Sequence, residues 1–190
     1  MTDEIDPVRR LRPDRVQPTG RNDPWMLAEE RNRLMSRIEQ TDSQGRPKWP
    51  AMYPRISYLD ELAAIEFLTR AFGFRERREA RMEPEPGDDK WGVLAWLELG
   101  DGVVMVGRVE KEVHKISSPA ETDGRFTCMI NVSVHDIDPH YARAQAEGAQ
   151  ITMEIEDAFY GYRRYEALDL EGHKWHFTEA LADIEQRSAT

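Results

Sequence analysis

The chain has 190 residues, enough for one ordinary domain or for two small modules that share a core. Hydrophobic residues make up 39% and charged residues 33%, which indicates a globular protein with part of the chain outside the core. The formal net charge of -10 argues against a nucleic acid or an anionic membrane as partner, because either would repel an acidic surface. No apolar run approaches the roughly 20 residues that span a bilayer, and the N-terminal region has no apolar signal core.

These properties predict a cytoplasmic protein. The single cysteine, Cys128, has no second cysteine with which to form an internal disulfide. It lies within an apolar, strand-like run, and we expect a small buried side chain there.

Residues 1–50 are predicted to form an N-terminal extension and linker. The first 21 residues mix arginines, acids and prolines with little apolar spacing, so we expect a mobile arm. Asp23 and Pro24 are a good helix start, and apolar residues at helical spacing then predict a helix over about 24–40. We expect this helix to dock on the main domain or on a partner subunit. Glycine and prolines mark the linker that follows.

Residues 51–180 contain a rough internal repeat. Each half begins with a short strand, continues into an amphipathic helix that a glycine ends, and then gives three strand-like runs. The halves, 51–109 and 125–180, therefore indicate an α+β fold of paired βαβββ modules that form an open, curved sheet cavity, followed by a tail at 181–190. Strands are predicted at 55–59, 74–82, 91–99, 103–108, 127–135, 151–155, 162–168 and 174–178, and helices at 62–72 and 139–147.

Three motifs carry a family resemblance. Residues 60–73, DELAAIEFLTRAFG, resemble the first helix of the glyoxalase/bleomycin-resistance superfamily, also called vicinal oxygen chelate proteins. Residues 159–163, FYGYR, and 169–175, DLEGHKW, resemble its PhnB-like branch. The resemblance covers roughly 52–179 and implies two βαβββ modules around a cavity that is often completed at a dimer interface. In some members, one side chain from each of four strands binds a divalent metal.

By this resemblance, the four ligand positions fall on Tyr53, Met105, Met129 and His176. Two thioethers and a phenol are poor ligands for a divalent cation, and only His176 is a good one. We therefore expect neither a metal nor another cofactor.

Side chains of a strand alternate between two faces, so the positions that do not pack on the helices should line the cavity. His176 is expected to be either a hydrogen-bonded cavity residue or a catalytic acid/base, because imidazole titrates near neutrality. His135 and His140 are expected to be exposed, and His173 to stabilise the turn before it. The predicted ligand-binding residues are Tyr53, Arg55, Ser57, Met105, Met129, Asn131, Ser133, Tyr160 and His176.

The leading hypothesis is a metal-independent protein of the glyoxalase/bleomycin-resistance type that binds a small organic ligand in the cavity and acts as a homodimer. The alternative is a lyase, isomerase or dioxygenase of the same superfamily, with His176 as acid/base or metal anchor and Tyr53 or Tyr160 orienting the substrate. A third hypothesis makes the N-terminal helix a docking element for a partner and the cavity vestigial.

Overall fold

The computed structural model describes residues 50–87, 91–112 and 114–189. The chain divides into two units, Met1–Lys48 and Trp49–Thr190, and all that follows concerns the second. The predicted N-terminal arm and helix lie outside the described residues. Among the residues described, none of the helices combines the length and the apolar character that crossing a membrane requires.

The first module consists of β1 (Arg55–Tyr58), α2 (Glu61–Phe72), β2 (Arg75–Glu76), β3 (Leu94–Leu99) and β4 (Gly102–Arg108). Its sheet, sheet 1, has the order β1-β4-β3-β2, with β1 parallel to β4 and the other pairs antiparallel. Helix α2 begins where the Asp60 side chain accepts a hydrogen bond from the Ala63 N–H, and it ends at Gly73 with φ 75°. Only glycine adopts that left-handed conformation without steric cost.

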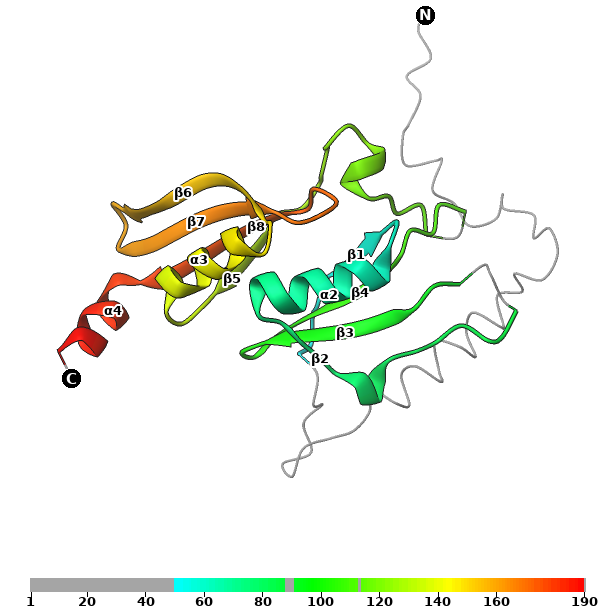
Figure 1. Ribbon diagram of the computed structural model, residues 1–190, viewed down its shortest axis with the longest axis horizontal. Coiled ribbons are helices and arrows are strands. Elements are labelled where there is room, and N and C mark those ends of the chain that lie inside the picture. Colours follow the sequence, from blue (N-terminus) through cyan, green and yellow to red (C-terminus); the bar gives the residue numbers. More distant parts are fainter. Residues whose placement is uncertain (1–49, 88–90, 113, 190) are drawn as a thin grey trace, which may run out of the picture. The chain divides into compact units, whose positions relative to one another are not determined.

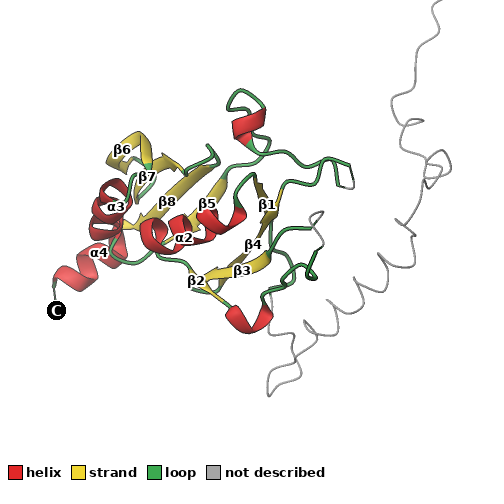
Figure 2. Cartoon of the chain, turned by 45° about the vertical axis from the view of Figure 1, so that its right-hand side comes forward, coloured by secondary structure: helices red, strands yellow, loops and turns green. Residues whose placement is uncertain are grey.

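The second module repeats this order (Figures 1 and 2). It consists of β5 (Ile130–Ser133), α3 (Ile137–Ala146), β6 (Gln150–Ala158), β7 (Tyr162–Leu168) and β8 (Lys174–Ala180), with α4 (Leu181–Ser188) after it. Its sheet, sheet 2, has the order β5-β8-β7-β6, again with its first strand parallel to its last. The predicted α+β fold of paired βαβββ modules is confirmed.

Several local predictions were wrong. The strand predicted at 74–82 is only the two-residue β2 followed by a short 3₁₀ helix, η3 (Arg78–Ala80), because the charged run there has no apolar alternation to hold it in the sheet. Cys128 is exposed rather than buried, since β5 begins only at Ile130.

One hydrophobic core extends through both modules. The ring of Phe72, at the end of α2, lies 5.5 Å from that of Trp175 and 4.9 Å from that of Phe177, both on β8. Helices α2 and α3 lie next to each other on the same side of the sheets (Figure 2). Each sheet thus has a helix face and an opposite face, which we call the far face.

Helix α3 caps the end of α2. His140 Nε2 donates to the Phe72 carbonyl at 3.0 Å, Arg143 Nε donates to the Ala71 carbonyl at 3.2 Å, and the Tyr165 hydroxyl donates to His140 Nδ1 at 2.6 Å. The last carbonyls of a helix have no partner within it, so these bonds satisfy groups that would otherwise be buried and unpaired. The prediction that His140 is exposed was wrong, because the residue is 5% exposed and its partners belong to the other module and to β7.

The turn between β7 and β8 holds the modules together from the other end. Asp169 Oδ2 accepts hydrogen bonds from the Tyr58 hydroxyl at 2.6 Å and from the Trp175 indole at 3.0 Å. Burial, together with the nearby charge of Asp169, raises the pKa of Tyr58 well above its ordinary value, so this hydroxyl stays protonated and donates.

The same turn also contacts the start of α2. The Glu171 carboxylate accepts from the backbone N–H groups of Leu59 at 2.8 Å and Asp60 at 2.9 Å. His173 stabilises its own turn, as predicted, through its backbone N–H, which donates to Asp169 Oδ1 at 3.0 Å. Its ring also places Nε2 3.0 Å from the Ser57 carbonyl of β1. This turn is therefore a contact between the modules rather than only a hairpin.

Candidate functional site

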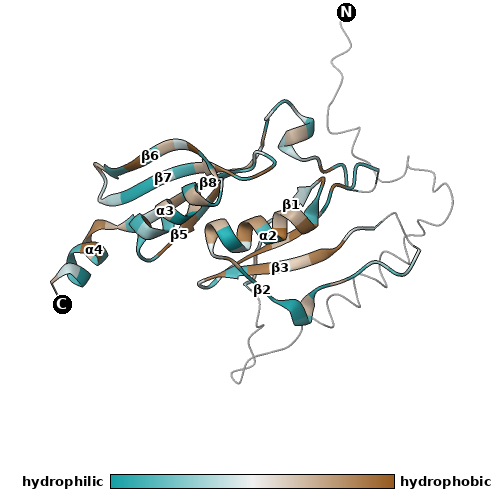
Figure 3. Ribbon diagram, in the orientation of Figure 1, coloured by the Kyte–Doolittle hydropathy of each residue, from teal (hydrophilic) through white to brown (hydrophobic). Residues whose placement is uncertain are grey.

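The far face of sheet 2 is the accessible polar surface to which the predicted site belongs. Trp175 and Phe177 of β8 are buried on the helix face, so the alternate residues of that strand point the other way. Figure 3 shows that β7 of sheet 2 is mostly hydrophilic, whereas β3 of sheet 1 is mostly hydrophobic. By alternation and register, the far face of sheet 2 carries Asn131, Ser133, Met153, Glu156, Arg164, Glu166, Leu168, Lys174, His176 and Thr178.

His176 is held by one strand neighbour and has one nitrogen free. Strand register pairs it with Asn131, and its Nδ1 lies 2.8 Å from the Asn131 amide oxygen. Its Nε2 is buried and has no hydrogen-bond partner among the described residues. Burial lowers the pKa of His176, and the positive charges of Arg164 and Lys174 add to this against the opposing charge of Glu166. The imidazole is therefore neutral near pH 7.

The charged side chains around His176 are paired across the strands. Lys174 Nζ lies 2.5 Å from Glu166, and Arg164 Nη2 lies 2.8 Å from Glu156. Sequence reasoning missed Glu166 and Lys174 as neighbours of His176. The alternation in the later part of β7, from Tyr165 on, could have placed Glu166 on the far face. The register of β7 against β8 was needed to set it opposite His176.

The predicted residues of the first module form a separate group. Strand register pairs Arg55 with Met105, as it pairs Asn131 with His176. When the first residues of α2 and α3 are aligned, Arg55 coincides with Asn131. Met105 of the first module therefore corresponds to His176 of the second. The Arg55 guanidinium bonds Glu110 at 2.5 Å. Ser57, predicted to line a cavity, is only 1% exposed, and the hydroxyl of this residue is buried without a partner among the described residues. Ser57 is therefore covered in this structure, like Nε2 of His176.

The remaining predicted residues lie near the ends of strands. Tyr53 is half-buried ahead of β1, and Met129 is partly exposed ahead of β5. Ser133 is exposed at the end of β5. Tyr160 lies in the turn between β6 and β7, where its hydroxyl accepts a hydrogen bond from Arg164 Nη1 at 2.8 Å. The structure thus brings Asn131 and His176 into contact and places Tyr160 along the same face.

These residues do not fit a divalent metal. Within 50–87, 91–112 and 114–189, no group of three or more His, Cys, Asp or Glu side chains is arranged to hold a metal ion. His176 Nδ1 is engaged by Asn131, and the nearest carboxylate across the strands, Glu166, is engaged by Lys174. A single imidazole nitrogen remains, whereas such sites in proteins usually have three or four protein ligands.

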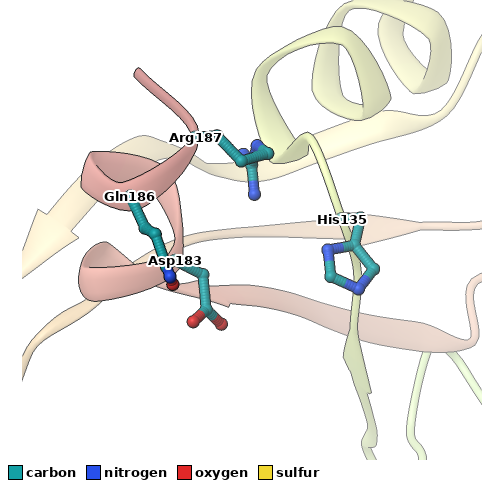
Figure 4. Close-up of a pocket in the computed structure, with 4 residues that line it drawn as sticks. All are labelled: His135, Asp183, Gln186 and Arg187. Carbon is teal, nitrogen blue, oxygen red and sulfur yellow. The ribbon is translucent and has the colours of Figure 1, made fainter. Parts of the chain in front are cut away.

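Two hollows of the surface lie elsewhere. One, of about 230 Å³, is lined by His135, Asp183, Gln186 and Arg187 (Figure 4). Arg187 is engaged there, 2.5 Å from Glu179 and 3.1 Å from Asp136. The other, of about 790 Å³, lies between α2 and the segment of β2 and η3. Neither is lined by a predicted ligand-binding residue.

Two βαβββ modules of equivalent strand order, sharing one core, define an α+β protein of the paired-module class. The sequence profile described as "Glyoxalase/Bleomycin resistance protein/Dioxygenase superfamily" matches residues 60–177, and the chain belongs to that superfamily. The predicted superfamily is thereby confirmed, while the PhnB-like branch stays a prediction.

Three relatives illustrate the similarity. The chain is 34% identical to TioX from Micromonospora sp. ML1, over 69% of this chain and 96% of that one, with a TM-score of 0.50. It is 26% identical over 147 residues to the uncharacterized protein Rv0887c of Mycobacterium tuberculosis, covering 77% of this chain and 84% of the relative. The hypothetical protein SA1046 from S. aureus, at 18% identity over 68% of this chain and 93% of that one, has a TM-score of 0.53 and shows the shared fold.

Proposed function

We propose that this protein binds a small organic ligand on the far face of sheet 2, around His176. The observation that supports the proposal is the buried Nε2 of His176, which has no hydrogen-bond partner among the described residues. An unpaired buried polar atom costs free energy, and a ligand that pairs with it would recover that cost. Asn131 holds the imidazole ring, and Arg164 and Lys174 are held in ion pairs beside it. Small-molecule sites are typically built with a few polar groups held in place in this way.

We also propose that binding needs no metal. The support is the donor set, in which His176 is the one good ligand among Tyr53, Met105, Met129 and His176. A buried imidazole alone cannot hold a divalent cation against water. Binding should therefore survive removal of metals by a chelator.

A homodimer is the third part of the proposal. Sheet 2 presents exposed Asn131 and Ser133 on its far face, and a ligand held there by one chain would stay open to water on its other side. A second copy covering this face would complete an enclosed site. Light scattering after size exclusion should give about twice the chain mass of 22.1 kDa; a monomer at micromolar concentration would contradict this part.

The experiment that tests binding is native mass spectrometry of the purified protein, with metal analysis of the same sample. We expect a bound organic molecule that is lost in His176→Ala and retained in His135→Ala, because His135 is exposed between β5 and α3. A stoichiometric divalent metal that disappears in His176→Ala would refute metal independence. Retention of the ligand in His176→Ala would refute the site.

One observation also favours an enzyme as the second candidate. A neutral imidazole with a bare nitrogen can accept a proton, as a general base does, and His176 has that form near pH 7. A lyase or isomerase of the same superfamily would use the imidazole of His176 as its general base, with Tyr160 orienting the substrate. Turnover of the co-purified molecule that is abolished in His176→Gln would support an enzyme, and binding without turnover would favour the first proposal.

A further inference from the structure

The larger of the two hollows, which we call the α2 hollow, shares none of its residues with the site proposed on sheet 2. It has a volume of about 790 Å³ and lies between α2 and the segment of β2 and η3. Leu62, Ile65 and Phe74 are the apolar residues that line it, and every other lining residue except Thr69 is an arginine or a glutamate. Many protein interfaces likewise have an apolar centre and a polar rim, and are enriched in arginine.

One wall of the α2 hollow is a single stripe of the helix. Leu62, Ile65 and Thr69 of α2 all line the hollow, and their spacing places them on one face of the helix. At 1.5 Å per residue this stripe is about 10 Å long, or two helical turns. Leu62 is 50% exposed, whereas Ile65 and Phe74 already belong to the core. The wall therefore offers an apolar contact at Leu62 to a partner helix that lies beside α2.

The opposite wall presents guanidinium groups to solvent. Arg78 lies 3.6 Å from Glu76, and Arg75 is paired with Glu98. The side chains of Arg78 and Arg75 are 85% and 74% exposed, whereas those of Glu76 and Glu98 are only 7% and 14% exposed. The carboxylates thus lie inside and the guanidinium groups outside, so a partner meets the positive groups first. A guanidinium has five N–H donors, and these pairs leave some of them for a second carboxylate.

The lining as a whole carries a small positive excess in a chain whose formal net charge is -10. Its charged residues are the arginines Arg70, Arg75, Arg78 and Arg81 and the glutamates Glu66, Glu76 and Glu79. Arg81 is also paired with Glu83, and Arg70 with Glu66, so Arg75 and Arg78 are the groups best placed to bind an anion. A nucleic acid would need many more phosphate contacts than these two residues provide. A few carboxylates of a partner match them, because arginine pairs well with a carboxylate.

From the apolar wall and the exposed arginines, we propose that the α2 hollow binds an acidic amphipathic helix of a partner protein. The apolar face of that helix packs on Leu62 alongside α2, and carboxylates at the edge of this face bond Arg75 and Arg78. A helix bound in a groove is recognised in this way, by apolar residues at i, i+3 or i+4 and i+7. The proposal is independent of the ligand proposed for sheet 2, because it uses none of the residues of that site.

Three synthetic peptides of about 14 residues, or four helical turns, test this inference on the full, 15N-labelled chain. The first has leucines on one face and glutamates beside them, the second has lysine in place of each glutamate, and the third has the composition of the first with its leucines spread around the helix. We expect the first to bind at least about tenfold more tightly than the others, because it alone matches both the apolar wall and the arginines. The shifted amide signals should belong to α2, β2 and η3. Equal affinities of the acidic and basic peptides, or shifts confined to other elements, would overturn the inference.

Two pairs of variants assign the roles of the walls. Arg78→Glu should weaken binding of the acidic peptide at least about fivefold, whereas Arg125→Glu, the same change of charge at an exposed residue before β5, should change it less than about twofold. Leu62→Asp should weaken it about tenfold, and the control is Leu170→Asp, at an exposed leucine of the turn between β7 and β8. Leu62→Asp should fold, because aspartate is favourable in the first turn of a helix. If each control weakens binding as much as its partner variant, the hollow is not the site and the inference fails.

The molar mass of the same variants separates a partner protein from a second copy of this chain. Light scattering after size exclusion should give the wild-type mass for both Leu62→Asp and Arg78→Glu. A lower mass in these two variants, with the wild-type mass in Leu170→Asp and Arg125→Glu, would assign the α2 hollow to a contact between copies and overturn the inference.

Discussion

Stability of this protein should fall as the pH is lowered from about 6.5 to about 4, because of His140. This residue is 5% exposed, donates through Nε2 to the Phe72 carbonyl and accepts the Tyr165 hydroxyl at Nδ1. Protonating Nδ1 would replace that acceptor by a donor and bury a charge beside Arg143. Burial first, and then the positive charge of Arg143, lower the pKa of His140 from 6.5 to about 4, against the opposing bond to Phe72.

The sign follows from linkage. Between these two pKa values the unfolded chain binds a proton that the folded chain does not. Lowering the pH in this range therefore lowers the free energy of unfolding. The contribution is complete above pH 6.5 and is lost progressively down to about pH 4. A pKa difference of this size corresponds to about 3 kcal/mol of unfolding free energy at about 1.4 kcal/mol per tenfold change in proton affinity.

Urea unfolding of the full chain, followed by tryptophan fluorescence at pH values from 4.5 to 8, measures this dependence. His140→Gln removes the titrating group, and the difference between wild type and variant isolates it from His176, whose pKa is also lowered, and from the carboxylates. His135→Gln is the control, because that ring is exposed, and it should keep the wild-type slope. If His140→Gln also keeps that slope, the buried neutral imidazole is not the cause and the reasoning fails.

Further predictions concern stability. Asp169→Ala should cost about 3 kcal/mol in urea unfolding, because it leaves two buried donors unpaired; a cost below 1 kcal/mol would contradict this. Gly92→Ala should lower the free energy of unfolding by about 1–3 kcal/mol, because an added Cβ would lie 2.5 Å from Cβ of Arg108. Gly102→Ala is the matched control: its added Cβ would lie 3.4 Å from the nearest atom, so this variant should lose less stability. Phe159→Ser, at a fully exposed ring, should change the unfolding free energy by less than about 0.5 kcal/mol, and a larger loss would mean that this ring packs on the chain.

The order of elements could be predicted from the sequence because its signals are local. Gly73 ends α2 as predicted, and the helix begins at Glu61, one residue before the predicted start. Strand β7 has the bounds that its alternation predicts, and β8 begins at the predicted Lys174. Charged positions with no alternation, such as those after Arg75, gave no reliable local signal, and the predicted strand there is mostly absent.

Burial set by the other module could not be predicted in this way. His140 is polar and near a helix start, which is typical of an exposed residue, yet its partner carbonyl is 68 residues away in sequence. The alternation of its strand correctly placed Ser57 on the face away from the helices. The same alternation cannot predict that Ser57 is buried there, because burial depends on other parts of the chain. The surroundings of His176 depended on the register of β7 and β8, which the length of the intervening turn decides.

The two modules keep their scaffold and differ on their far faces, which is a reason to propose a ligand site on only one of them. In each module the last strand holds the first residue of the helix: Arg108 bonds the Glu61 side chain, and Glu179 accepts the Ile137 N–H at 2.9 Å. The equivalent far-face positions differ, since Met105 of the first module stands where the second has His176. On sheet 1 that face also carries Trp96, which is 1% exposed. On sheet 2 that face is polar and carries His176, whose buried Nε2 has no partner among the described residues, and for this reason we propose the second module as the one that binds a ligand.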